Sequence, residues 1–240
     1  MVSAIIVAAG SSRRMGFDKL FAKLDGKPVL WHSIQAFSET KEVDEILIVT
    51  REDQMDLVEH LVATERMEKV TKVISGGAER HISVWNGLQA VDSKDSAFIA
   101  IHDGARPLVT PKLIKACIDL AETHGAACCA SQIPDTVKRA SVEQMVTESV
   151  ERTGLWAMQT PQVFSSGLIL QAYAALMAKH EMVTDEVSAV QKLGKKIALL
   201  KNDDWNMKIT FPHDLELAEH VLDLRRKKTA KSAKARPITH

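Results

Sequence analysis

The sequence of 240 residues has little of what marks membrane, secreted or metal-binding proteins. It contains no apolar run near the roughly 20 residues that a transmembrane helix needs. Met1 leads straight into an apolar segment without the charged region of a signal peptide, so we expect a cytoplasmic protein. The three cysteines stand in apolar surroundings, which is typical of small buried residues in a reducing compartment. We therefore expect neither disulfides nor a cysteine-bound metal.

Net charge gives no sign of a nucleic-acid partner, because 31 Lys and Arg residues balance 31 Asp and Glu residues. The balance hides an asymmetry. Residues 225–240 hold seven Lys and Arg and no acid, which leaves 24 basic and 31 acidic residues before them. A basic segment of this kind can bind anionic surfaces, but it is more often a solvated end of the chain. We predict a single domain over residues 1–224, followed by a disordered basic tail at 225–240.

Three common catalytic or phosphate-binding patterns are also missing. The nine histidines include no HExxH or comparable metal spacing. The interval from Gly10 to Gly16 is too wide for a Walker phosphate loop, and Phe-Asp follows where that loop has Lys-Ser or Lys-Thr. The dinucleotide fingerprint G-x-G-x-x-G does not occur either. The sequence therefore matches none of these standard sites.

What the sequence does have is a distinctive loop after its first strand. The apolar run at residues 5–7 predicts a buried parallel strand that ends at Ala8, Ala9 and Gly10. Residues this small let a flat ligand lie against the backbone, and Gly10 allows a turn that a larger residue would resist. The strand end therefore suits a planar group such as a nucleobase.

Three cations follow in the same loop, namely Arg13, Arg14 and Lys19. Backbone amides and cations together suit a polyphosphate, and the loop lies where open α/β sheets bind their ligands. The alternative is an ordinary strand, turn and helix with a solvated basic start. Cations are unfavourable near a helix amino terminus unless an anion offsets them, which favours the phosphate interpretation.

Strands alternate with helical patterns along the chain, which indicates βαβ units. We therefore predict a Rossmann-like, doubly wound α/β fold with a mostly parallel sheet. The predicted strands after the first lie at residues 45–50, 69–74, 97–102 and 195–200, and the predicted helices at 28–37, 55–62, 79–91 and 166–180. Thr184 is expected to cap a further helix start, because it precedes Asp-Glu and an apolar residue.

Two more loops leave the same edge of the predicted sheet. Gly76 and Gly77 separate the third strand from a helix, although a glycine turn of this kind also occurs without a ligand. Asp103 follows the fourth strand, where a carboxylate near phosphates suits Mg²⁺, which takes one or two carboxylates plus phosphate oxygens. Arg106 either binds the phosphate of a second substrate or braces the loop against Asp103. We interpret His102 as structural, because it has no partner constellation.

Residues 134–155 read as two polar, alternating strands around a turn. Such a ribbon is too polar to be buried in its own domain, and an isolated hairpin is barely stable in water. It therefore predicts a protruding β-arm that needs a partner. A solvated hairpin without a function is the alternative.

The stretch AAGSSRRMGFDK (residues 8–19), together with HDGARP (102–107) and NMKITFPHDL (206–215), resembles the 2-C-methyl-D-erythritol 4-phosphate cytidylyltransferases of isoprenoid synthesis. The resemblance runs from Ala4 to about Ala218. It implies an enzyme that transfers a cytidylyl group from CTP to 2-C-methyl-D-erythritol 4-phosphate with Mg²⁺ and releases pyrophosphate. It also implies a homodimer whose β-arm completes the acceptor site of the other subunit, without a membrane or nucleic-acid partner. The implied roles are catalysis by Arg14, Lys19, Arg152 and Lys208; nucleotide binding by Ala8, Ala9, Gly10, Gly77, Arg80 and Ser83; acceptor binding by Arg106, Thr136, Arg152, Thr160 and Lys208; and metal binding by Asp103.

Three positions depart from the family pattern. Asp18 stands where proline is common, and Ala78 stands where an aspartate is common. An acid is also common three residues before the lysine at position 208, but Trp205 occupies that place, so we assign no second metal ligand. The residues themselves specify a phosphate and not its carbon skeleton. Two alternatives therefore stay open, namely cytidylyl transfer to another polyol phosphate such as ribitol 5-phosphate, and a nucleotide-binding regulator without turnover.

Overall fold

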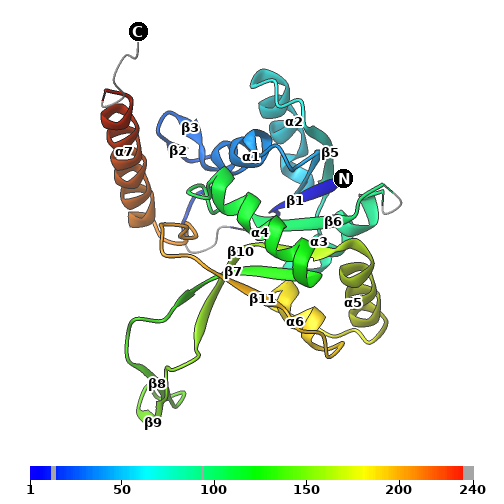
Figure 1. The fold of residues 1–240 in the computed structure, drawn as a ribbon, viewed down its shortest axis with the longest axis vertical. Coiled ribbons are helices and arrows are strands. Elements are labelled where there is room, and N and C mark those ends of the chain that lie inside the picture. Colours follow the sequence, from blue (N-terminus) through cyan, green and yellow to red (C-terminus); the bar gives the residue numbers. More distant parts are fainter. Residues whose placement is uncertain (12–14, 93–94, 235–240) are drawn as a thin grey trace.

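The computed structural model describes residues 1–11, 15–92 and 95–234 (Figure 1). Seven strands form one sheet in the order β11-β7-β10-β6-β1-β4-β5. Neighbouring strands run parallel except at β10, which is antiparallel to both β6 and β7. The sheet consists of β1 (Val2–Ala8), β4 (Glu45–Thr50), β5 (Val70–Ser75), β6 (Phe98–Asp103), β7 (Ala126–Gln132), β10 (Trp156–Ser165) and β11 (Ala198–Lys201). The predicted mostly parallel α/β fold is confirmed.

Helices cover both faces of this sheet, because successive residues of each buried strand point to opposite sides. In β1, Ile6 packs in one apolar cluster with α1 (Val29–Glu39), α2 (Met55–Thr64) and α4 (Pro111–His124). The neighbouring Ile5 packs in a second cluster on the other face. That cluster contains residues of α3 (Arg80–Ala90), α5 (Ser166–Ala178) and α6 (Glu186–Gln191). Cys128 and Cys129 of β7 divide in the same way and both are buried, as the sequence predicts.

Several element boundaries differ from the predicted ones. A short pair of strands, β2 (Lys23–Leu24) and β3 (Lys27–Pro28), precedes α1, and a 3₁₀ turn (Glu52–Gln54) precedes α2. The prediction that Thr184 caps α6 was wrong. Asp185 is the N-cap, and its side chain accepts a hydrogen bond from the Ser188 amide at 3.0 Å.

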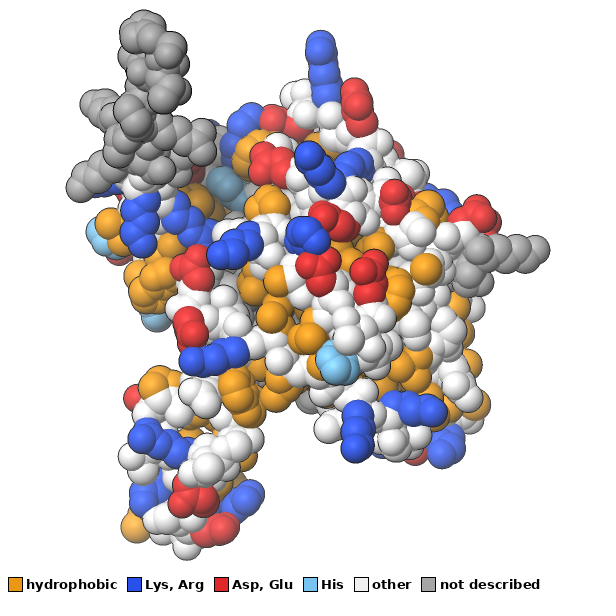
Figure 2. Space-filling model, viewed as in Figure 1, with side chains coloured by type: hydrophobic (Ala, Val, Ile, Leu, Met, Phe, Trp, Pro, Cys, Tyr) orange, Lys and Arg blue, Asp and Glu red, His pale blue; other side chains and the backbone are white. Residues whose placement is uncertain are grey.

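The β-arm protrudes from the body of the domain, as Figures 1 and 2 show. Strands β8 (Val137–Ala140) and β9 (Val146–Val150) pair antiparallel, and the Arg139 side chain forms an ion pair with Glu148 at 2.9 Å. Apolar side chains at the tip are exposed, Val142 by 95% and Met145 by 68%. The predicted hairpin is confirmed, and within the single chain its tip lies in solvent.

The sequence predicted that the domain ends at residue 224, but helix α7 runs from His213 to Lys234. The first two arginines of the supposed tail attach this helix to the body. Arg225 donates a hydrogen bond to the Leu108 carbonyl at 2.7 Å, and Arg226 forms an ion pair with Asp25 at 2.7 Å. Basic residues also suit the carboxyl end of a helix, where the dipole is negative. Residues 235–240 lie outside the described residues.

Within the described ranges, no helix is long and apolar enough to cross a membrane.

Replacement of Gly87 tests the close packing of α3 on the sheet. A Cβ at Gly87 would lie 2.8 Å from Cγ2 of Ile5 and 2.9 Å from Cγ2 of Val49, whereas a Cβ at Gly167 in α5 would meet no atom within 4 Å. Both Gly→Ala changes gain up to about 1 kcal/mol of helix preference, but overpacking costs about 1–3 kcal/mol at position 87 alone. In urea unfolding, we expect the free energy of unfolding of Gly87→Ala to be about 1–3 kcal/mol lower than that of Gly167→Ala. Equal effects would contradict this packing argument.

Candidate active site

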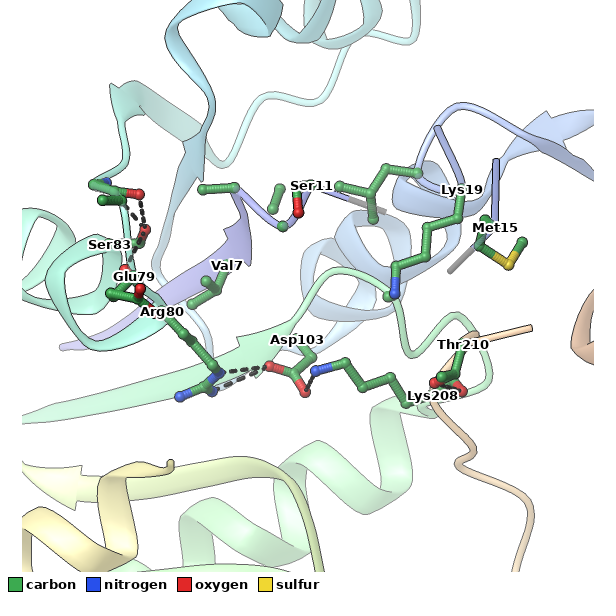
Figure 3. A pocket seen from close by; sticks show the side chains of 17 residues that line it. Val7, Ser11, Met15, Lys19, Glu79, Arg80, Ser83, Asp103, Lys208 and Thr210 are labelled. Atoms are coloured by element: carbon green, nitrogen blue, oxygen red, sulfur yellow. Dashed lines mark hydrogen bonds and ion pairs between the residues drawn. The ribbon is translucent and has the colours of Figure 1, made fainter. Parts of the chain in front are cut away.

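A cavity of about 440 Å³ opens at the carboxyl ends of β1 and β6, where open α/β sheets bind ligands (Figure 3). It is formed by the loop after β1, the start of α3, the end of β6 and the segment before α7. The residues that line it are Val7, Ala8, Ala9, Gly10, Ser11, Met15, Lys19, Leu20, Gly77, Ala78, Glu79, Arg80, Ser83, Asp103, Ala105, Lys208 and Thr210.

The six predicted nucleotide-binding residues all line this cavity: Ala8, Ala9, Gly10, Gly77, Arg80 and Ser83. The loops after β1 and β5 are in direct contact, since a Cβ at Gly76 would lie only 2.6 Å from the Cβ of Ala9. The Ser83 hydroxyl accepts a hydrogen bond from the Gly77 amide at 3.1 Å and so fixes the second loop. The result is a wall of small side chains and backbone groups.

Two predicted catalytic lysines line the cavity as well, although 189 positions separate them in the sequence (Figure 3). The Lys19 ammonium donates a hydrogen bond to the Ile209 carbonyl at 2.8 Å, and the Lys208 ammonium lies 2.9 Å from Asp103 Oδ2. One segment thus holds both cations. The prediction for Arg14 falls outside the described residues.

Asp103 is a nearly buried carboxylate with three cationic partners. Arg80 contacts its Oδ1 at 3.1 Å, while Lys208 at 2.9 Å and Arg106 at 3.6 Å face its Oδ2. Burial by itself raises the pKa of the Asp103 carboxyl, but the charges of Arg80, Lys208 and Arg106 outweigh it and hold the pKa well below its usual range. The side chain is therefore a fixed negative charge on the cavity wall.

A chain of hydrogen bonds sets the position of Asp103. Its backbone amide donates to the Thr160 hydroxyl at 3.0 Å, which in turn contacts His102 Nδ1 at 3.0 Å. His102 Nε2 faces the Arg106 carbonyl at 3.3 Å. All of these hydrogen bonds form when the Thr160 hydroxyl donates to His102 Nδ1 and a neutral His102 donates from Nε2 to the Arg106 carbonyl. His102 is structural, as predicted.

Two predicted acceptor-binding residues have other partners in this structure. Thr160 is only 3% exposed, and its hydroxyl is engaged by Asp103 and His102. Arg106 donates to the Asn206 carbonyl at 2.7 Å and faces Asp103, and its side chain is 12% exposed. The second interpretation of Arg106, a brace for the loop, therefore fits the geometry. Both residues support Asp103 and contribute nothing to the cavity lining described above.

Asp18, the acidic departure in the phosphate loop, is turned away from the cavity lining. Its Oδ1 accepts from the Leu20 amide at 3.0 Å, and its Oδ2 accepts from Gln54 Nε2 at 2.5 Å and faces Arg51 at 3.3 Å. The positive charge of Arg51 offsets this carboxylate. Asp18 therefore caps the turn, and Arg51 compensates its charge outside the cavity lining.

The residues fit a divalent cation only together with a nucleotide. Among the described residues, no group of three or more His, Cys, Asp or Glu side chains could hold a metal by itself. Asp103 supplies a single hard carboxylate beside the cavity, and nucleotide phosphates supply the remaining oxygens that Mg²⁺ prefers. Both carboxylate oxygens already face cations, so a divalent cation at Asp103 would have to displace one of these ion-pair partners.

The arm residues Thr136 and Arg152 are exposed and lie apart from the cavity lining. Arg152 donates a hydrogen bond to the Pro134 carbonyl across the base of the arm. Sequence reasoning explained the Thr-Asp-Glu run by helix capping alone and gave Glu186 no role of its own. In the structure Glu186 is a fully buried carboxylate that binds Arg80. The signal was the run itself, because a cap needs only one of its side chains.

Acid titration should reveal the buried His102. Burial lowers the pKa of His102 from 6.5 to about 3. At pH values between these two, His102 is protonated in the unfolded chain and neutral in the folded chain. The free energy of unfolding therefore falls as pH drops from 6.5 towards 3. Above pH 6.5, neutral His102 makes its full contribution to stability. We expect His102→Asn to flatten this part of a pH series of urea unfolding midpoints. An unchanged slope in the variant would contradict a buried, neutral His102.

Comparison with known proteins gives a family match over most of the chain. The sequence pattern of the 2-C-methyl-D-erythritol 4-phosphate cytidylyltransferase family matches residues 2–224. A protein of that name from Caldanaerobacter subterraneus is 41% identical over 224 residues, which cover 92% of this chain and 98% of the relative. Another from Lachnospira eligens is 39% identical over 223 residues, covering 91% and 97%.

Solved structures give the same result. The 4-diphosphocytidyl-2C-methyl-D-erythritol synthase of Anaerococcus prevotii superposes with a TM-score of 0.81 at 30% identity, covering 93% of this chain and 96% of that one. The 2-C-methyl-D-erythritol 4-phosphate cytidylyltransferase of Thermus thermophilus gives a TM-score of 0.76 at 27% identity, covering 91% and 98%. The fold, the cavity and the near-complete sequence match together show that the chain belongs to the 2-C-methyl-D-erythritol 4-phosphate cytidylyltransferase family.

Proposed function

We propose that the protein converts CTP and 2-C-methyl-D-erythritol 4-phosphate to 4-diphosphocytidyl-2-C-methyl-D-erythritol and pyrophosphate. Its relatives are named for cytidylyl transfer to this acceptor and for synthesis of this product. One observation carries this proposal. Lys19 and Lys208 line one cavity beside a wall of small residues that suits a pyrimidine, so a triphosphate and a second phosphate can be held together (Figure 3).

The reaction needs positioning and charge stabilisation more than a protein base. An oxygen of the acceptor phosphate attacks the α-phosphorus of CTP, the bond from that phosphorus to the bridging β-phosphate oxygen breaks, and pyrophosphate leaves. The acceptor phosphate is already a dianion near neutral pH and is a competent nucleophile. Lys19 stabilises negative charge on the triphosphate side, and Lys208 orients the acceptor phosphate. We assign Arg14 to the same triphosphate contact.

We further propose that Asp103 holds Mg²⁺ when CTP is bound. Held there, the ion would supply positive charge that offsets the negative charge developing on the departing pyrophosphate. The support is the position of Asp103 on the cavity wall, where neighbouring cations hold the pKa of its carboxyl well below its usual range and keep it ionised. Arg80 and Arg106 keep that charge in place.

The β-arm is proposed to complete the acceptor site of a second copy of the chain. Thr136 and Arg152 are exposed on an arm that leaves the body, and the apolar tip residues lack cover within one chain (Figure 2). A ribbon of this kind gains stability from a partner surface. In the proposed homodimer, Arg152 of one subunit contacts the acceptor phosphate bound to the other.

Nucleotide choice tests the proposed reaction directly. Pyrophosphate release should require an acceptor phosphate and Mg²⁺, with 2-C-methyl-D-erythritol 4-phosphate as the best member of a panel of polyol phosphates. We expect CTP to be preferred over UTP, ATP and GTP, because the wall of Ala8, Ala9, Gly10 and Gly77 leaves a pyrimidine-sized slot. A kcat/KM for ATP comparable with that for CTP would contradict this, and no release with any acceptor would remove the enzyme proposal.

Mixing two inactive variants tests whether the arm acts on the other subunit. Arg152→Ala should lower kcat/KM for the acceptor by about ten- to a hundredfold, the cost of one charge-assisted phosphate contact, with CTP binding nearly intact. Lys19→Ala should lower turnover instead. In a heterodimer of the two, one site then carries both changes and the other is intact, so roughly half of the wild-type activity returns.

The control for this experiment is Arg139→Ala, a change at another exposed arm arginine that pairs with Glu148. It should leave both substrates' kinetic constants unchanged. If subunit exchange is shown independently and no activity returns, Arg152 does not act on the other subunit.

A further inference from the structure

Glu186 is a buried carboxylate that the proposed reaction does not use. Its side chain is 0% exposed at the first position of α6. Helix capping does not explain it, because Asp185 already caps the helix. Its Oε1 accepts from Arg80 Nη1 at 2.5 Å and from the Tyr173 hydroxyl at 3.1 Å, and its Oε2 accepts from Arg80 Nη2 at 3.1 Å. A buried charge held by three hydrogen bonds fixes its partners strongly.

Arg80 therefore bridges two carboxylates. On its other edge, Nε and Nη2 donate to Asp103 Oδ1 at 3.2 and 3.1 Å. The planar guanidinium matches a carboxylate on each edge, a geometry that lysine cannot reproduce. Trp85 of α3 also stacks on Tyr173, with ring centroids 6.5 Å apart, which holds the helix that begins at Arg80 against the Glu186 side. Arg80 is locked in place.

Lys208, in contrast, is held loosely at the same carboxylate (Figure 3). Its ammonium has one hydrogen bond to Asp103 Oδ2 at 2.9 Å, and its side chain is 37% exposed. A flexible, partly solvated lysine leaves such a pair at little cost, because water and an incoming anion replace the contact. Arg80 would have to give up four hydrogen bonds to do the same.

We propose that Glu186 is a positioning residue that fixes Arg80 as the permanent counterion of Asp103, so that Lys208 is the cation released to the acceptor phosphate. The proposal rests on the proposed function, since the acceptor phosphate is that of the cytidylyl transfer. Without the Glu186 charge, Arg80 is free to turn to a phosphate, and Lys208 stays on Asp103 beside Arg106.

Glu186→Gln tests this because it keeps the shape and removes the charge. We expect the acceptor KM to rise by about tenfold or more, while the CTP dissociation constant, measured by calorimetry, is unchanged or lower. A purely structural defect would weaken both substrates alike or lower only the active fraction. Glu181→Gln, at an exposed carboxylate that pairs with Lys192, is the matched control and should change neither constant. An unchanged acceptor KM in Glu186→Gln, or equal weakening for both substrates, would overturn the proposal.

A double variant keeps the test valid if Glu186→Gln does not fold. Removing both partners leaves no unpaired buried charge, so Arg80→Met/Glu186→Gln is better tolerated than the loss of one partner. If Glu186 acts only through Arg80, the double variant matches Arg80→Met in acceptor KM. A further loss in the double variant would overturn the proposal.

Exchange of the Arg80 Nε–H hydrogen with solvent, followed in a nitrogen–proton correlation NMR spectrum, gives a readout that needs no turnover. This exchange should be slow in the wild-type protein and at least tenfold faster in Glu186→Gln. Unchanged exchange would overturn the positioning role, whether or not the protein proves to be a cytidylyltransferase. Absence of pyrophosphate release from the wild-type protein would instead overturn the proposed function alone.

Discussion

The described site depends on the ion pairs that the ionised carboxylate of Asp103 forms. Three separate segments bring a cation to it, with Arg80 from α3, Arg106 from the loop after β6, and Lys208 from the segment before α7. Taking one charge out of water costs several kcal/mol unless partners with good geometry compensate it. Burial of this carboxylate therefore couples assembly of the cavity from these segments to folding of the domain.

The segment before α7 contacts both the loop after β6 and the loop after β1. The Ile209 amide donates to the Ala105 carbonyl at 2.8 Å, and the Ile209 carbonyl accepts from Lys19 at 2.8 Å. Its side chain is fully buried in a third apolar cluster that includes Ala218 and Val221 of α7. Apolar packing of a helix at the end of the domain thus positions a lysine from the first loop. This explains why α7 is firmly attached to the body, although its sequence is polar and basic.

The proposed nucleotide-binding and acceptor-binding parts of the site differ in how they are built. Small residues at the ends of β1 and β5 form the wall proposed to contact the nucleotide, and this wall lies at the end of the packed sheet. The predicted acceptor contacts lie partly on the arm, whose two strands are exposed on both faces. A rigid body with an exposed arm suits an enzyme that binds its nucleotide within one chain and draws part of its second site from another.

The sequence alone determined the fold class, the β-arm and the nucleotide wall, because these depend on local patterns. Period-two and period-3.6 apolar spacing specifies strands and helices, and small residues at a strand end specify a close backbone approach. Tertiary structure decided the partners of charged side chains, which depend on segments far apart in the sequence. Only folding shows that Thr160 supports Asp103, that Arg51 offsets Asp18, and that Glu186 holds Arg80. A local pattern cannot reveal such pairs, because an ion pair is set by the distance between two atoms and not by their spacing along the chain.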